Sequence, residues 1–65
     1  MYRNEKIKGK MAELGFTVET LSQKTGLSTK TVTNVRNGEN VNVETLSTVA
    51  AALEIPMPEL FKEAA

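Results

Sequence analysis

The stretch TVETLSQKTGLSTKTVTNVRNG, residues 17–38, decides the fold of this chain of 65 residues. Thr17 can cap a first helix, because its hydroxyl oxygen can accept a hydrogen bond from a free N–H of the first turn. Gly26 can adopt the left-handed conformation that ends a helix at little energetic cost. Ser28 can cap a second helix. The sequence therefore predicts two short helices joined by a glycine turn.

The second predicted helix has an apolar face and a polar face. Val32 and Val35 lie about 60° apart on a wheel of 3.6 residues per turn, so we expect the pair to pack inward. The opposite side carries hydrogen-bonding groups: Lys30, Thr33, Asn34 and Asn37. The pair Asn37-Gly38 tolerates a positive φ and ends the unit. This division is typical of a helix-turn-helix motif, here about residues 17–38.

Residues throughout the motif resemble the lambda-repressor-like DNA-binding family (Cro/C1-type, XRE): Leu21, Ser22, Gly26, Val32, Val35 and Asn37-Gly38. The resemblance extends over about residues 7–61. It implies an all-α fold, a compact bundle of five helices. At this length we expect a single domain, residues 1–65, in which about 60% of the surface of the unfolded chain is buried.

The composition argues against several classes of protein. The sequence has no cysteine, histidine or aspartate, so it offers no thiolate or imidazole ligand and no nucleophile–base pair. We expect no metal site, no cofactor and no enzymatic activity. No apolar run approaches the roughly 20 residues that cross a bilayer, and no apolar signal segment follows Met1. We therefore expect a cytoplasmic protein without membrane contact.

The charge is balanced overall but unevenly distributed. The formal net charge is zero, whereas most DNA-binding domains are basic. Residues 1–38 contain seven lysines and arginines and three glutamates, a net charge of +4. Residues 39–65 contain one lysine and five glutamates, a net charge of −4. If the halves stay apart on folding, the motif half can face phosphates while the acidic half faces away; otherwise the charges form a mixed, solvated surface.

The residues before the motif predict a first helix. Asn4 is the expected N-cap. Ile7, Met11 and Leu14 recur at i, i+4 and i+7, so they should form one apolar stripe of a helix that ends near Gly15. Phe16 should fill the core between this helix and the next.

The residues after the motif predict two more helices. Asn42 is the expected cap of a fourth helix, whose apolar face is Leu46, Val49, Ala50 and Leu53. The segment Ile55-Pro56-Met57-Pro58 must interrupt that helix, because proline disfavours helical geometry in the preceding residue. Pro58 suits the first turn of a short fifth helix that carries Leu60 and Phe61.

The resemblance implies that the second helix of the motif lies in the major groove of DNA, with its first turn and outer face against the base edges. Lys30 can donate to guanine O6 and N7, and Asn34 can form a bidentate pair with adenine. The expected base-contact residues are Thr29, Lys30, Thr33 and Asn34. The alternative is that Thr33 and Asn34 are ordinary solvated polar residues.

Phosphate contacts in the family come from the N-termini of two helices, where free N–H groups and the helix dipole meet an oxyanion. The expected phosphate-contact residues are Thr17, Val18, Ser28, Asn37, Asn40 and Asn42. Val18 departs from the family pattern, in which glutamine is common, so only its backbone N–H can serve. Glu39 stands where many relatives carry a basic residue.

Together these features predict a sequence-specific DNA-binding regulator of transcription, a prophage or mobile-element repressor or Cro-like protein. It would bind a double-stranded operator as a homodimer, with residues near the Asn37-Gly38 loop and the fifth helix as the dimer surface. The alternative is a protein-interaction module of the same fold, an antirepressor or antitoxin that binds another regulator. The acidic second half and four expected exposed apolar residues suit such a partner: Val41, Val43, Met57 and Leu60.

Overall fold

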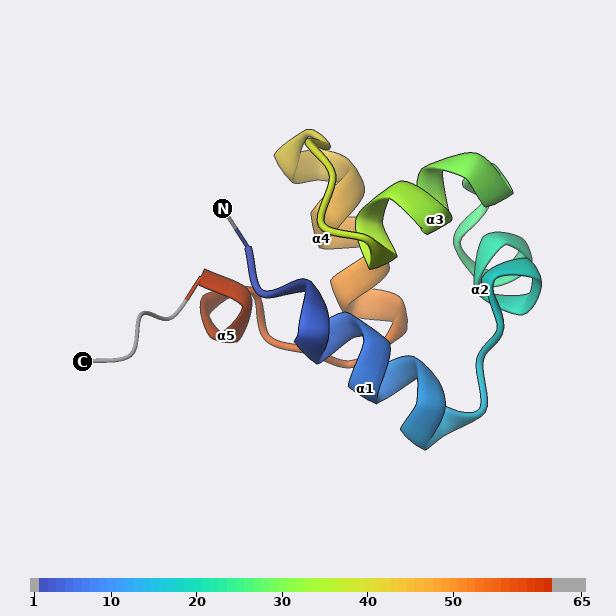
Figure 1. Cartoon of the computed structure of the whole chain (residues 1–65), viewed down its shortest axis with the longest axis horizontal. Coiled ribbons are helices and arrows are strands. Elements are labelled where there is room, and N and C mark those ends of the chain that lie inside the picture. Colours follow the sequence, from blue (N-terminus) through green and yellow to red (C-terminus); the bar gives the residue numbers. More distant parts are fainter. Residues whose placement is uncertain (1, 62–65) are drawn as a thin grey trace.

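A computed structural model describes residues 2–61 and has five helices (Figure 1). They are α1 (Asn4–Leu14), α2 (Val18–Thr25), α3 (Thr29–Arg36), α4 (Val43–Ala52) and α5 (Met57–Phe61). Residues 2–61 contain no strand, and the expected all-α bundle of five helices is confirmed. Met1 and residues 62–65, which belong to the expected domain and charge counts, lie outside the described residues.

One aliphatic core joins the helices. α3 packs against α1, α2 and α4, and α2 also packs against α4. The predicted inward pair Val32 and Val35 is fully buried. Complete burial of an aliphatic side chain stabilises a fold by about 1.5–3 kcal/mol, so this pair is a major anchor of α3. The other fully or nearly fully buried residues come from all four remaining helices and the linker: Ile7, Met11, Leu21, Leu46, Val49, Ala50, Leu53 and Leu60.

The predicted caps of three helices are confirmed. The side-chain oxygens of Thr17, Ser28 and Asn42 accept hydrogen bonds from the backbone N–H groups three residues later, at 3.1, 3.1 and 2.7 Å. Each bond satisfies one of the N–H groups that a helix start leaves free. Gly26 ends α2 with a φ of 79°, so the left-handed turn of the motif is confirmed as well.

α1 ends near Gly15 as predicted, but its N-cap and one residue of its apolar stripe differ from the prediction. Arg3 occupies the N-cap position, and Asn4 is already the first helical residue. The Asn4 amide is instead drawn to α3, where it donates a hydrogen bond to the Arg36 carbonyl at 3.0 Å. Leu14 is 43% exposed and does not complete the buried stripe of Ile7 and Met11. The chain turns at Gly15, and Phe16 packs against the core as predicted.

The fifth helix also corrects one expectation. Leu60 was expected to be an exposed apolar residue, but it is fully buried. Pro56 redirects the chain so that α5 turns Leu60 into the core. Its neighbour Phe61 is 43% exposed. Val43 is 67% exposed, as expected, whereas Val41 and Met57 are half-buried and pack against the core.

Candidate nucleic-acid interface

The four expected base-contact residues lie on one face of α3. Thr29 and Lys30 in the first turn are exposed, and Thr33 and Asn34 one turn later are half-buried. Residues three and four positions apart are neighbours on a helix surface, so these side chains form one continuous patch. The opposite face of α3 is held in the core by Val32 and Val35. The patch is therefore carried by a rigidly anchored helix.

The chemistry of this patch suits the edges of base pairs. Lys30 supplies a mobile ammonium group, and Asn34 supplies a planar amide with both donors and an acceptor. Within residues 2–61, neither side chain makes a hydrogen bond or an ion pair with another residue. The backbone carbonyl of Asn34 accepts a hydrogen bond from the Glu39 N–H at 2.9 Å and lies 3.5 Å from the Tyr2 hydroxyl. Both polar groups thus remain available to a ligand.

The expected phosphate-contact residues lie at the ends of helices. Thr17 and Ser28 are the N-caps of α2 and α3, and Asn42 is the N-cap of α4. Their capping oxygens are already occupied as acceptors, so a phosphate would meet free backbone N–H groups and the remaining side-chain donors. Asn37 and Asn40 are exposed on the loop that links α3 to α4.

Val18 can offer a phosphate only its backbone N–H, because its side chain is apolar. Its side chain is half-buried and packs against the core. The first two N–H groups of α2 have no acceptor within the helix, and they lie at the positive end of its dipole. An anion is favoured there even without a glutamine side chain.

Two cationic residues beside this helix end were not identified as a pair from the sequence. Lys8 of α1 and Arg36 of α3 line a hollow of about 410 Å³ together with Thr17 and Val18. Lys8 and Arg36 are 28 positions apart in the chain, and only the packing of α1 on α3 brings them to one hollow. The excess of cations in residues 1–38 was the signal in the sequence for a cationic surface, but it does not identify which cations lie close together.

Tyr2 is a further residue that the sequence did not single out. It is 8% exposed, and its hydroxyl lies 2.9 Å from the carbonyl oxygens of both Val35 and Glu39. Burial, and to a lesser degree the charge of Glu39, raises the pKa of Tyr2 above its ordinary value of 10.0. The phenol is therefore a neutral donor to the end of α3 at physiological pH.

A family model for the Cro/C1-type HTH DNA-binding domain matches residues 6–62. The chain belongs to this family. It is a DNA-binding domain of the helix-turn-helix class, a type that indicates a transcriptional regulator and is typically not enzymatic. Comparison with curated proteins and with solved structures gives no match.

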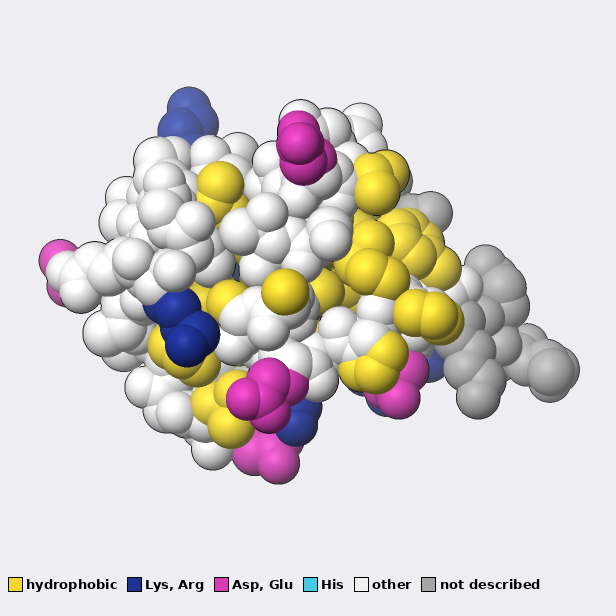
Figure 2. Space-filling model, turned by 180° about the vertical axis from the view of Figure 1, so that it is seen from behind, with side chains coloured by type: hydrophobic (Ala, Val, Ile, Leu, Met, Phe, Trp, Pro, Cys, Tyr) yellow, Lys and Arg dark blue, Asp and Glu magenta, His cyan; other side chains and the backbone are white. Residues whose placement is uncertain are grey.

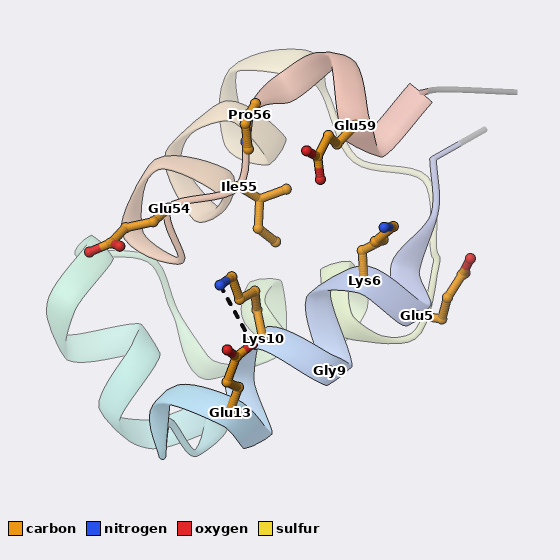
Figure 3. Close-up of a pocket in the computed structure, with 9 residues that line it drawn as sticks. All are labelled: Glu5, Lys6, Gly9, Lys10, Glu13, Glu54, Ile55, Pro56 and Glu59. Carbon is orange, nitrogen blue, oxygen red and sulfur yellow. Dashed lines mark ion pairs between the residues drawn. The ribbon is translucent and has the colours of Figure 1, made fainter.

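Another hollow of this Cro/C1-type domain has the opposite character. It measures about 460 Å³ and lies between α1 and the segment that links α4 to α5 (Figure 3). Four carboxylates and two ammonium groups line it: Glu5, Glu13, Glu54, Glu59, Lys6 and Lys10. Lys10 and Glu13 form an ion pair at 3.5 Å, which contributes little because both groups are accessible to water. None of the expected DNA-contact residues lines this acidic hollow.

The part of the chain that the structure describes contains no helix with the length and apolar character to cross a membrane. Among residues 2–61, no group of three or more acidic or other metal-binding side chains is placed to hold a metal ion.

Proposed function

We propose that this domain regulates transcription by reading a specific DNA operator in the major groove with α3. Thr29, Lys30, Thr33 and Asn34 would contact base edges. The observation that carries the proposal is the division of α3: Val32 and Val35 are fully buried, while the opposite face offers an uncommitted ammonium group and an uncommitted amide. A helix so anchored can present both groups to a base pair without a large ordering cost.

The DNA backbone would be held on both sides of α3. Thr17, Val18 and Ser28 would meet phosphates at the starts of α2 and α3, and Asn37, Asn40 and Asn42 would do so from the following loop. Lys8 and Arg36 add two cations to the first group, next to the start of α2. This supports binding by helix ends supplemented with few cations, as a domain of zero net charge requires.

The proposed regulator is a repressor or Cro-like protein of a prophage or mobile element, acting in the cytoplasm. Occupation of the operator would itself be the regulatory event. This part of the proposal is supported by the resemblance of the domain to the Cro/C1-type family.

Two copies would bind the operator as a dimer, and an apolar face on each copy would form the contact between them. A hollow of about 250 Å³ is lined by Tyr2, Asn40, Val41, Val43, Leu46 and Phe61. Figure 2 shows apolar side chains gathered near the end of the described chain. Exposed Val43 and Phe61 adjoin this hollow, so one copy can supply the projecting side chains and its partner the hollow, and the reverse, as a two-fold interface requires. The two copies of α3 would then be about 34 Å apart, one turn of DNA.

A protein-interaction role, as an antirepressor or antitoxin, is the second candidate. The acidic hollow beside α1 and the exposed Val43 favour it, because both are available to another regulator. Binding to DNA depends on salt through the release of counterions, with about 2–4 cations engaged per subunit expected here. An affinity for duplex DNA that does not change between low and physiological salt would favour this second candidate.

The deciding experiment is selection of bound sites from random duplex DNA, followed by titration of single-base variants of the selected site. Asn34→Ala should weaken binding to the preferred site by about 1–3 kcal/mol and relax the preference at one base pair. Lys10→Ala is the matched control, because Lys10 lies on the acidic hollow and should affect all sequences equally or not at all. If Asn34→Ala binds the whole panel as the wild type does, α3 is not the reading surface.

A further inference from the structure

Tyr2, which precedes α1, and Asn4, the first residue of α1, hold the C-terminal end of α3, the proposed reading helix. The Tyr2 hydroxyl lies 2.9 Å from the carbonyl oxygens of Val35 and Glu39, and its single proton can serve either one. The Asn4 amide donates to the carbonyl of Arg36 at 3.0 Å. These bonds connect residues 32 to 37 positions apart, so the first residues of the chain reach the last turn of α3 and the loop beyond it.

These contacts act at the C-terminal end of α3, where the helix itself does not supply a donor for every carbonyl. The last four carbonyls of a helix lack donors from the helix. In α3 the backbone closes part of this gap, because the N–H groups of Gly38 and Glu39 bond to the carbonyls of Val35 and Asn34 at 3.2 and 2.9 Å. Tyr2 donates across the same turn. The helix end and the loop are thus held as one unit by a side chain from outside the motif.

The same segment also contacts the proposed dimer face. The backbone N–H of Arg3 donates to the carbonyl of Leu60 in α5 at 2.9 Å. The Tyr2 side chain lines the apolar hollow with Val41 and Phe61. A single buried side chain therefore contacts both the apolar face and the end of α3.

We propose that Tyr2 is a positioning residue for DNA binding, whose hydroxyl fixes the last turn of α3 and the following loop. This inference rests on the proposed function. The loop carries Asn37 and Asn40, and the last turn carries Arg36, beside the hollow at the start of α2. Binding groups must be held to within about 0.5 Å of their productive geometry, so loosening this turn reduces affinity although Tyr2 itself touches no DNA.

Tyr2→Phe tests the proposal, because it keeps the buried ring and removes only the hydroxyl. Operator affinity should fall about 3- to 10-fold, the loss that corresponds to one hydrogen bond, with the salt slope unchanged. The titration is performed at a temperature at which circular dichroism shows both proteins fully folded. Ile55→Val is the control: Ile55 is buried between α4 and α5, so this change lowers the melting temperature without touching α3. A purely structural Tyr2 would leave both affinities at the wild-type value.

A second readout uses the free protein. In Tyr2→Phe the amide protons of Gly38 and Glu39 should exchange with solvent faster than in the wild type, whereas Ile55→Val should change them no more than the rest of the core. If Tyr2→Phe does not fold, Asn4→Ala removes the other donor to the end of α3 and carries the same expectation for affinity and exchange.

The outcomes separate the two proposals. A wild-type protein that binds no duplex DNA overturns the proposed function, and the positioning role with it. A wild type that binds its operator, together with a folded Tyr2→Phe or Asn4→Ala of equal affinity, overturns the positioning role and leaves the proposed function standing.

Discussion

The two ends of α3 are held in different ways. Its N-terminal end is capped by Ser28, which accepts a hydrogen bond from the Thr31 N–H only three residues away. Its C-terminal end is held by Tyr2 and Asn4, more than 30 residues away in the chain. The first end is a local property of the motif, whereas the second exists only after α1 has packed on α3. The difference shows that the start of the reading helix is specified by its own sequence, whereas its end is fixed by the packing of the whole domain.

The largest loss of stability should come from a substitution at Gly38, next to the C-terminal end of α3 that Tyr2 and Asn4 hold. Gly38 has a φ of 82°, and a Cβ there would lie 3.1 Å from the Asn4 side chain. Gly26 has a similar φ of 79° but open space around it. Valine at either position should cost about 1–3 kcal/mol of unfolding free energy, with Gly38→Val the more damaging.

Chemical denaturation of both variants measures this difference. Adding Asn4→Ala to Gly38→Val should recover part of the excess loss, because the side chain in the way is removed. An unchanged melting temperature in Gly26→Val would show that the left-handed turn of the motif does not restrict that residue.

The next largest effect, on DNA affinity, should distinguish base contact from phosphate contact along α3. Lys30→Ala, near the N-terminal end, should change the base preference and cost about 1–3 kcal/mol on the preferred operator. Arg36→Ala, at the C-terminal end, should weaken binding to all sequences about equally and lower the salt slope by about one. Titrations of an operator panel at several salt concentrations test both. Equal loss of base preference in the two variants would contradict the division.

Removing the N-cap of α3 should lower the free energy of unfolding by a smaller amount. Ser28→Ala removes the cap of α3 and should cost about 1 kcal/mol of stability. Ile55→Val is the matched control, because it removes one buried methylene group away from α3 and should also cost about 1 kcal/mol. Both should be destabilised to a similar extent, but only Ser28→Ala should also weaken DNA binding. A thermal unfolding curve and one operator titration for each variant decide the point.

The smallest effect should appear at high pH. Because burial and Glu39 raise the pKa of Tyr2 in the folded state, the unfolded chain loses the phenolic proton first. The contribution of Tyr2 to stability is therefore complete below pH 10.0 and is lost as the pH rises through the folded-state pKa. Urea unfolding of the wild type and of Tyr2→Phe across this pH range measures the contribution, because the two proteins differ only in the phenolic hydroxyl. A difference between the two that stays constant above pH 10.0 would contradict the expected burial of the phenol.

The sequence by itself determined the parts of the fold that depend on neighbouring residues. The caps Thr17, Ser28 and Asn42 act within one helical turn, and Gly26 is recognisable because few other residues adopt its conformation cheaply. The spacing of Val32 and Val35 identifies the buried face of α3, and so also the face that remains for a ligand. The assignment of individual bases and phosphates to these residues stays a prediction.

Only the tertiary structure decided which distant groups meet. The stripe of α1 predicted a buried Leu14, yet the turn at Gly15 leaves it 43% exposed. Through the packing of α1 on α3, Lys8 and Arg36 line one hollow beside the start of α2, and Tyr2 reaches the end of α3. Helical periodicity gives the face of each side chain but not the partner opposite it, because the partner depends on how whole helices pack.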